Sequence, residues 1–205
     1  MAPMSLKRFR ILQLALVLAS HALGVASEGQ VRSIDTANSK LLVHTFKSGL
    51  FSGFADNHAV EAPFAEGTVD EGALCVKFVV DSRRMRVLDP QLEGEKRRKI
   101  QERMLGPEVL DSTHFPQITF ESTNIQRVGQ GRLLVAGRLS LHGVTRPISV
   151  TVHNENGHYL GTCVLKQRDF GIAPISIAGG TVKVKDELNI EFDIRTETQA
   201  AGNGK

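Results

Sequence analysis

Alternation of apolar and polar residues near the end of the chain is the feature that most constrains its fold. The apolar residues share one parity: Val182, Val184, Leu188, Ile190, Phe192 and Ile194. The residues between them are polar or charged: Thr181, Lys183, Lys185, Glu187, Asn189, Glu191, Asp193 and Arg195. A period of two places alternate side chains on opposite faces of a strand. The pattern therefore predicts one long strand with an apolar face and a solvent face.

The same alternation recurs in three earlier segments. Their apolar residues are Leu74, Val76, Phe78 and Val80, then Leu133, Val135, Leu139 and Leu141, then Val144, Ile148, Val150 and Val152. Turn-forming residues separate these segments at 70–72, 129–131, 142–143 and 154–157. Short antiparallel strands with one apolar face and such spacing predict a meander that closes into a barrel or a sandwich.

One segment departs from this pattern and predicts a helix. Asp89 precedes Pro90, which suits an N-cap followed by the first helical residue. Leu92, Ile100 and Met104 then recur at helical spacing, and Gly106-Pro107 is a stop signal. We expect a helix from about Pro90 to Leu105, inserted between two strands, with one further turn through Leu110 as the alternative.

The N-terminus has the features of a secretory signal peptide. Lys7, Arg8 and Arg10 precede a short apolar run from residue 11 to 23, and small residues follow at Gly24, Ala26 and Ser27. The run is shorter than the roughly 20 apolar residues that span a bilayer. We therefore assign residues 1–27 to a signal peptide, expect cleavage between Val25 and Gly29, and predict a periplasmic or secreted protein. A retained anchor is the alternative.

Loss of this segment removes the net positive charge of the chain. The chain has 25 basic and 22 acidic residues, and the three basic residues of the signal peptide account for the whole excess. A balanced mature protein gives no electrostatic reason to expect nucleic acid as a partner. The remainder is long enough for one domain with a core. We place that domain at residues 30–197, followed by a small polar tail at 198–205 that we expect to be frayed.

Three stretches carry a family resemblance. They are residues 114–122 (HFPQITFES), 137–148 (GRLSLHGVTRPI) and 168–172 (RDFGI). In this order and spacing they resemble the YceI-like family of exported, lipocalin-like proteins that bind polyisoprenoid lipids. The resemblance spans roughly Val31 to Thr196. It implies an all-β fold, an extended antiparallel eight-stranded lipocalin-like barrel with a short helical insertion near one end.

The apolar face of the predicted strands is the candidate ligand site. From composition alone these side chains would fill a packed core, but the family resemblance favours an isoprenoid tunnel. The candidate ligand-binding residues are Phe78, Val80, Phe120, Leu139, Ile148, Val150, Leu188, Ile190 and Phe192. The resemblance thus implies a carrier, store or protector of an isoprenoid or other long-chain amphiphilic lipid, with no cofactor beyond that ligand. Transient contact with a membrane and pairing into a homodimer are compatible with the sequence.

An exported enzyme, or a haem or electron-transfer partner on the same barrel, is the alternative. The sequence shows no nucleophile elbow, zinc-protease helix motif or phosphate-binding loop, so we assign no catalytic residue. His153 and His158 flank the turn at 154–157, but two histidines alone rarely form a metal site. His58 suits a turn or surface role better than a contact with a ligand head. Cys75 and Cys163 are more simply interpreted as two isolated thiols than as a disulfide.

Overall fold

The structure is a computed structural model that describes residues 31–48, 57–177 and 182–197. The predicted signal peptide (1–27) and the predicted tail (198–205) lie outside the described residues. Among the described residues, no helix is both long and apolar enough to span a lipid bilayer.

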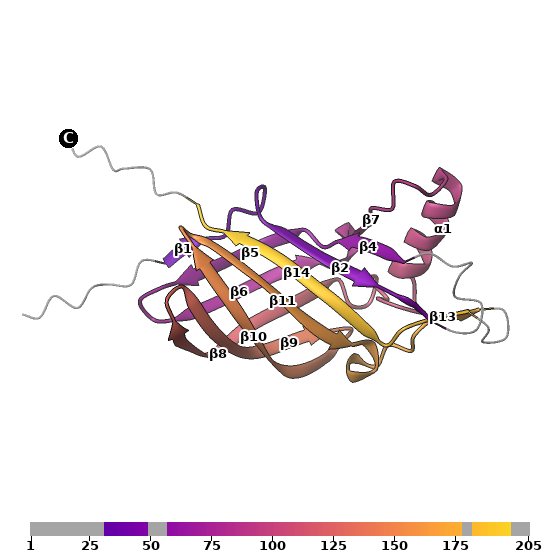
Figure 1. Cartoon of the computed structure of the whole chain (residues 1–205). Helices are drawn as coiled ribbons and strands as arrows, with labels where there is room; N and C mark the ends of the chain where they lie inside the picture. Colours follow the sequence, from indigo (N-terminus) through magenta and orange to yellow (C-terminus); the bar gives the residue numbers. More distant parts are fainter. Residues whose placement is uncertain (1–30, 49–56, 178–181, 198–205) are drawn as a thin grey trace, which may run out of the picture.

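Most of the described chain forms one antiparallel sheet that curls into a barrel (Figure 1). Its strands, in spatial order, are β1 (Val31–Ser33), β5 (Phe64–Asp70), β6 (Cys75–Asp81), β8 (Gln117–Gly129), β9 (Arg132–Leu141), β10 (Val144–Glu155), β11 (His158–Lys166), β14 (Glu187–Arg195), β2 (Lys40–Thr45), β4 (His58–Glu61) and β7 (Arg86–Val87). Each strand pairs antiparallel to its neighbours, as the alternating sequence pattern predicts.

The pairing of the strands closes the sheet into a barrel. β2 pairs with β14 on one side and with β4 on the other. β4 ends at Glu61, and β5, which pairs with β6, begins at Phe64. β1 is the other edge strand of the sheet. Just after it, Ile34 forms an antiparallel bridge with Thr196, which follows β14, so this edge also meets the far side of the sheet. The predicted all-β barrel is therefore confirmed.

The predicted number of eight strands is wrong as a count, since the described sheet has eleven. The difference comes from short pieces. β1 and β7 are brief edge segments, and Ala62-Pro63 separates β4 from β5 in what is otherwise one path along the barrel wall. A proline lacks the N–H that a continuous ladder needs, so a strand tends to be interrupted there.

Tight turns join the long strands where the sequence predicts them. β9 and β10 are joined by His142 and Gly143, with φ of 51° and 74°. β10 and β11 are joined by Asn156 and Gly157, with φ of 54° and 85°. Two consecutive positive φ angles match the twist of the flanking strands in a two-residue hairpin. We call the end of the barrel that holds the β5–β6, β8–β9 and β10–β11 turns the hairpin end.

The predicted long strand at the C-terminal end of the barrel is two strands. β13 (Val182–Val184) pairs with β12 (Ser176–Ile177) and β3 (Lys47–Ser48) in a separate three-stranded sheet. Lys185 and Asp186 interrupt the chain before β14 begins at Glu187. The Lys185 N–H bonds the Phe46 carbonyl, and the Asp186 carbonyl accepts from the Gln167 N–H. These two backbone hydrogen bonds lie outside the barrel ladder, so the chain does not continue from β13 to β14 as one strand.

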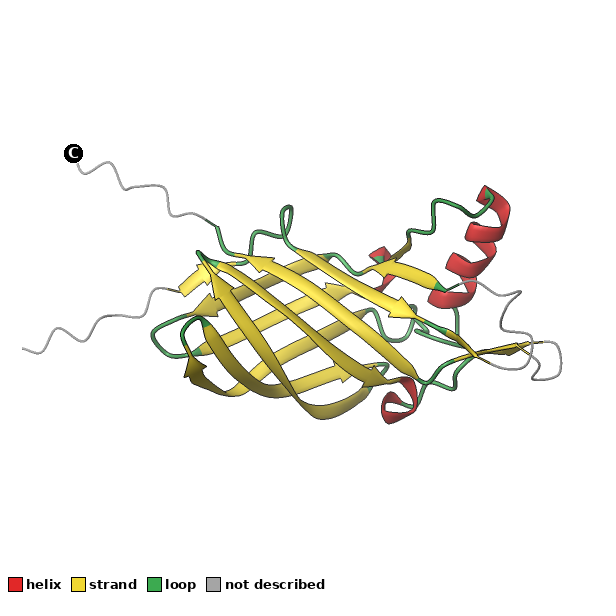
Figure 2. Cartoon of the chain, in the orientation of Figure 1, coloured by secondary structure: helices red, strands yellow, loops and turns green. Residues whose placement is uncertain are grey.

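The helical insertion lies at the other end of the barrel, which we call the helix end (Figure 2). α1 (Gly94–Leu105) ends before Gly106, as predicted, but it starts four residues later than Pro90. The reason is that Asp89 does not cap the helix. Its buried carboxylate, 3% exposed, accepts a hydrogen bond from the Ala59 N–H at 3.0 Å and contacts Nδ1 of His58 at 2.5 Å. Asp89 therefore ties the insertion to β4.

Two short 3-10 helices complete the helix end. They are η2 (Ser82–Arg84) and η3 (Gln167–Phe170). The side chain of Gln101 in α1 accepts from the Val87 N–H and donates to the Met85 carbonyl, each at 2.7 Å. These two bonds fix α1 against β7. Phe170 is 2% exposed, and Gly171 after it has a φ of 74° that ends η3.

Candidate ligand cavity in the barrel

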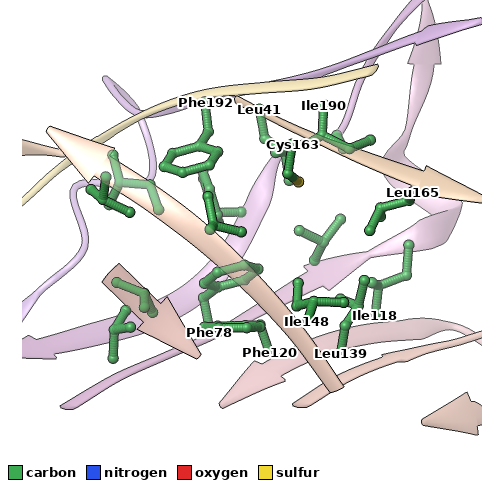
Figure 3. Close-up of a pocket in the computed structure, with 18 of the residues that line it drawn as sticks. Leu41, Phe78, Ile118, Phe120, Leu139, Ile148, Cys163, Leu165, Ile190 and Phe192 are labelled. Atoms are coloured by element: carbon green, nitrogen blue, oxygen red, sulfur yellow. The ribbon is translucent and has the colours of Figure 1, made fainter. Parts of the chain in front are cut away.

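The barrel encloses a cavity of about 300 Å³. Its wall is formed by inward-facing side chains from every long strand, and Figure 3 shows these side chains converging from opposite sides. Most of the lining is aliphatic or aromatic. Water is held poorly in an apolar cavity, because a buried water molecule needs two to four polar partners. The interior is therefore suited to an apolar molecule.

All nine residues predicted from the sequence line this cavity: Phe78, Val80, Phe120, Leu139, Ile148, Val150, Leu188, Ile190 and Phe192. The alternation of the strands brings them together, since their sequence neighbours on the opposite parity face outward. Asn189 and Glu191, for example, are exposed on either side of buried Ile190. That these nine residues bind a ligand stays a prediction.

Sequence reasoning missed part of the wall. β2 contributes Leu41 and Val43, and β11 contributes Tyr159, Cys163 and Leu165. β11 does alternate, but Gly161 and Cys163 weaken its apolar signal. β2 is short, and the apolar residues Leu41 and Leu42 stand next to each other, which hides its parity. The helix end contributes Met85, Met104, Val109 and Leu110 from segments that are not barrel strands.

Two glycines in the wall allow aromatic rings to approach the backbone of the neighbouring strand closely. A Cβ at Gly137 would stand 2.4 Å from Cζ of Phe120, and one at Gly161 would stand 2.4 Å from Cζ of Phe192. Each ring thus covers a glycine on the neighbouring strand. Because these rings pack along the wall, the centre of the barrel stays open. Phe78 stacks on Phe120 with ring centroids 5.3 Å apart, which extends the same aromatic surface.

The helix end of the cavity is closed by apolar side chains. Met104 of α1, Leu110 after α1 and Ile172, which follows the buried Phe170, line the cavity at this end. Arg168 and Asp169 are exposed, and their backbone atoms are engaged: the Arg168 N–H donates to Asp186 and the Asp169 carbonyl accepts from Arg146. The RDFGI stretch is thus a structural turn.

His58 contacts Asp89 and is not among the residues that line the cavity, so its turn role is favoured.

The hairpin end of the cavity is polar. Glu71, Arg127, Asn154 and Tyr159 line it there, and we call these four residues the polar rim. Glu71 follows β5, Arg127 lies near the end of β8, Asn154 near the end of β10, and Tyr159 near the start of β11. Glu71 and Arg127 are exposed, so the cavity reaches solvent at this end.

A hydrogen-bonded cluster organises one side of the polar rim. The Tyr159 hydroxyl and the Arg32 guanidinium both donate to Oε1 of Glu71. Tyr159 is 7% exposed, and its pKa is raised to about 12 by burial and by the neighbouring Glu71 carboxylate. The cluster ties β1, the β5–β6 turn and β11 together across part of the opening.

Ultraviolet titration tests this cluster, because Tyr159 is the only tyrosine and the chain has no tryptophan. We expect tyrosinate absorbance to appear in the folded protein with a midpoint of about 12, compared with a value near 10.0 for an unperturbed tyrosine. The pKa of Tyr159 is higher in the folded protein than in the unfolded chain. The protonated Tyr159 hydroxyl therefore contributes its full stabilisation below about pH 10, and this stabilisation is lost as the pH rises toward 12. A midpoint near 10 in the folded protein would contradict the burial of Tyr159.

The two cysteines are free thiols, as the sequence analysis favours. Both Cys75 and Cys163 line the cavity. Burial raises the pKa of the Cys163 thiol to about 11, which leaves little nucleophilic thiolate near neutral pH.

His153 pairs with Leu160 and His158 with Glu155, so the two histidines do not face each other across the hairpin. In the described part of the chain, no three His, Cys, Asp or Glu side chains gather closely enough to hold a metal ion.

The sequence pattern of the YceI-like domain matches residues 28–196. The chain belongs to the YceI-like family. This assignment agrees with the closed antiparallel barrel and with the three stretches at 114–122, 137–148 and 168–172. The YceI-like domain is a binding-protein fold, and a barrel with an apolar interior is consistent with that class.

Curated relatives of this YceI-like protein include a UPF0312 protein of Vibrio parahaemolyticus, 29% identical over 125 residues, which cover 56% of this chain and 65% of that protein. A UPF0312 protein of Shewanella baltica is 33% identical over 73 residues, covering 31% of this chain and 38% of that protein. The matched regions thus span less than two thirds of these relatives.

Among solved structures, the crystal structure of Burkholderia cenocepacia BcnA superposes with a TM-score of 0.61. It is 19% identical and covers 80% of this chain and 99% of that chain. At this identity the likeness supports the fold alone.

Proposed function

We propose that this YceI-like protein is an exported binding protein that holds an isoprenoid or another long-chain amphiphilic lipid inside its barrel. The observation that carries the proposal is the cavity of about 300 Å³ with an apolar wall along its length. Small-molecule sites typically have volumes of about 300–1,000 Å³ and a mainly apolar lining with a few polar groups. The cavity matches this description at the lower end of the range.

Apolar burial supplies the affinity in this proposal. Each 100 Å² of tail surface removed from water contributes about 2.5 kcal/mol. The open centre of the barrel matters here, since a close-packed core offers no room for a tail. The rings of Phe120 and Phe192 support such an open centre because they lie over Gly137 and Gly161. The ligand would be carried, stored or protected from water and from other reactants.

Export fits this role, because a lipid that crosses an aqueous compartment needs an apolar shelter. The basic start, short apolar run and small residues of segment 1–27 support it. N-terminal sequencing of protein recovered outside the cytoplasm checks the expected cleavage between Val25 and Gly29, and a chain that still begins at Met1 would contradict it.

A series of prenyl alcohols tests the binding function. Lipid-stripped protein is titrated with prenol, geraniol, farnesol and geranylgeraniol, which share one head and lengthen by one isoprene unit at a time. We expect affinity to rise at least about tenfold per unit until the cavity is filled, because each buried methylene contributes roughly 0.8 kcal/mol. Isothermal titration calorimetry measures the trend. Equal affinities, or no binding by any member, would contradict a lipid-binding barrel.

The rival function, a haem or electron-transfer partner on the same barrel, predicts a different observation. Protein purified from its natural compartment would then absorb visible light. A colourless protein that carries extractable lipid favours the binding function.

A further inference from the structure

The polar rim lies at one end of an otherwise apolar cavity. Its hydrogen-bond acceptors already have partners within the protein, whereas some of its donors do not. The Glu71 carboxylate already accepts hydrogen bonds from Tyr159 and Arg32. The neighbouring Asp70 carboxylate accepts from the backbone N–H groups of Gly72 and Ala73, at 2.9 and 2.8 Å. The two acidic residues that line the cavity at this end therefore both have hydrogen-bond partners within the protein.

The remaining rim groups are donors. The Arg127 side chain forms no hydrogen bond or ion pair with any residue in the described part of the chain. The Asn154 oxygen accepts from the Gly157 N–H at 3.3 Å, which leaves its NH2 group as a further donor. A guanidinium has five N–H groups in a planar arrangement that matches carboxylate and phosphate oxygens. The rim groups that remain available to a ligand are thus a positive charge and hydrogen-bond donors.

A bulge in β8 brings Arg127 to this position. Ser122 pairs with Gly137 and Asn124 pairs with Ala136, so Thr123 is an extra residue in β8. Before it, Ile118 and Phe120 face the cavity. After it, the inward parity changes to Ile125 and Arg127. The bulge therefore turns an arginine toward the cavity mouth that a regular strand would turn toward solvent.

We infer that the polar rim recognises an acidic headgroup, a phosphate or a carboxylate, on the amphiphile that occupies the cavity. This inference rests on the proposed lipid-binding function and adds the class of head and the direction of the ligand. The head lies at the hairpin end against Arg127 and Asn154, and the tail extends toward Met104 and Leu110 at the helix end. A charge-assisted hydrogen bond to an ionised head is stronger than one to a neutral head.

Three ligands with one tail and different heads test the inference: geranylgeranyl phosphate, geranylgeranoic acid and geranylgeraniol. We expect lipid-stripped protein to bind at least one of the two acids about tenfold more tightly than the alcohol, and the preferred acid identifies the head. Arg127→Gln should reduce this preference to less than about threefold, because it weakens binding of the acid more than binding of the alcohol. Arg127→Lys should retain part of it, since a single positive charge remains.

Arg138→Gln is the matched control. Arg138 lies on β9, is exposed, and pairs with Glu121 on the outer surface of the barrel at 3.3 Å. It should leave every affinity unchanged. Tight binding of geranylgeraniol with no preference for either acid would contradict the headgroup inference and leave the lipid-binding function standing. A preference that survives Arg127→Gln would also contradict it, whereas failure of all three ligands to bind would contradict the binding function itself.

Discussion

Replacing Ile190 with aspartate should unfold the barrel. Ile190 is 8% exposed on β14, where it pairs with Val43 of β2 and Cys163 of β11. An aspartate at this position would place a carboxylate against the apolar wall without an ion-pair partner, and burial of an unpaired charge is very costly. We expect a loss of about 4 kcal/mol or more in the free energy of unfolding, measured by chemical denaturation.

The outer face of the same strand offers a matched control. Asn189→Asp introduces the same side chain one residue away, where Asn189 is exposed. We expect a change within about 0.5 kcal/mol. Lys183→Asp should be equally mild, but Lys183 lies on β13 in the three-stranded sheet and so does not report on β14. Equal losses from Ile190→Asp and Asn189→Asp would contradict the register of β14, because a shift of one residue exchanges the two faces.

Replacing Leu139 with tryptophan should block ligand binding without unfolding the protein. Leu139 lines the cavity, and on β9 it pairs with Phe120 of β8. A tryptophan there has room to extend into the open centre. We expect the lipid-free variant to lose less than about 1 kcal/mol, compared with about 1–3 kcal/mol for overpacking a filled core. Affinity for geranylgeraniol should fall at least about tenfold.

Leu134→Trp controls for the added aromatic ring. Leu134 is on the same strand, β9, and is 37% exposed on the outer surface. This variant should bind geranylgeraniol as the parent protein does. If Leu139→Trp lowered stability by several kcal/mol and the parent protein bound no lipid, the interior would be a packed core, and only the barrel fold would stand.

Much of the wall was predictable because it depends on local periodicity. Ile190 and Phe192 face inward since β14 is regular from Glu187 to Arg195. The hairpins at His142-Gly143 and Asn156-Gly157 were also predictable, because few residues tolerate consecutive positive φ angles. The end of α1 at Gly106 followed from its stop signal in the same way.

The features that failed depend on contacts between distant segments. Asp89 does not begin the helix, because the Ala59 N–H and His58, about thirty residues earlier, engage its carboxylate. The break between β13 and β14 arises from backbone bonds of Lys185 and Asp186 to Phe46 and Gln167. Neither competition is visible in a single segment of sequence.

The polar rim was not predictable for a related reason. Arg127 reaches the cavity only because Thr123 is bulged, and a bulge shifts parity without leaving a strong residue signature. The one available signal is the change of apolar parity between Phe120 and Ile125. Glu71 and Tyr159 are 88 positions apart in the chain, and only closure of the barrel joins them.

Lipid content of the protein isolated from its natural compartment tests the central claim most directly. The purified protein is weighed intact by native mass spectrometry, then denatured and extracted, and the extract is identified by mass spectrometry. The account predicts about one long-chain amphiphile per protein chain, absent from a Leu139→Trp variant prepared in parallel. Parent protein that has the bare polypeptide mass and yields no lipid would contradict it.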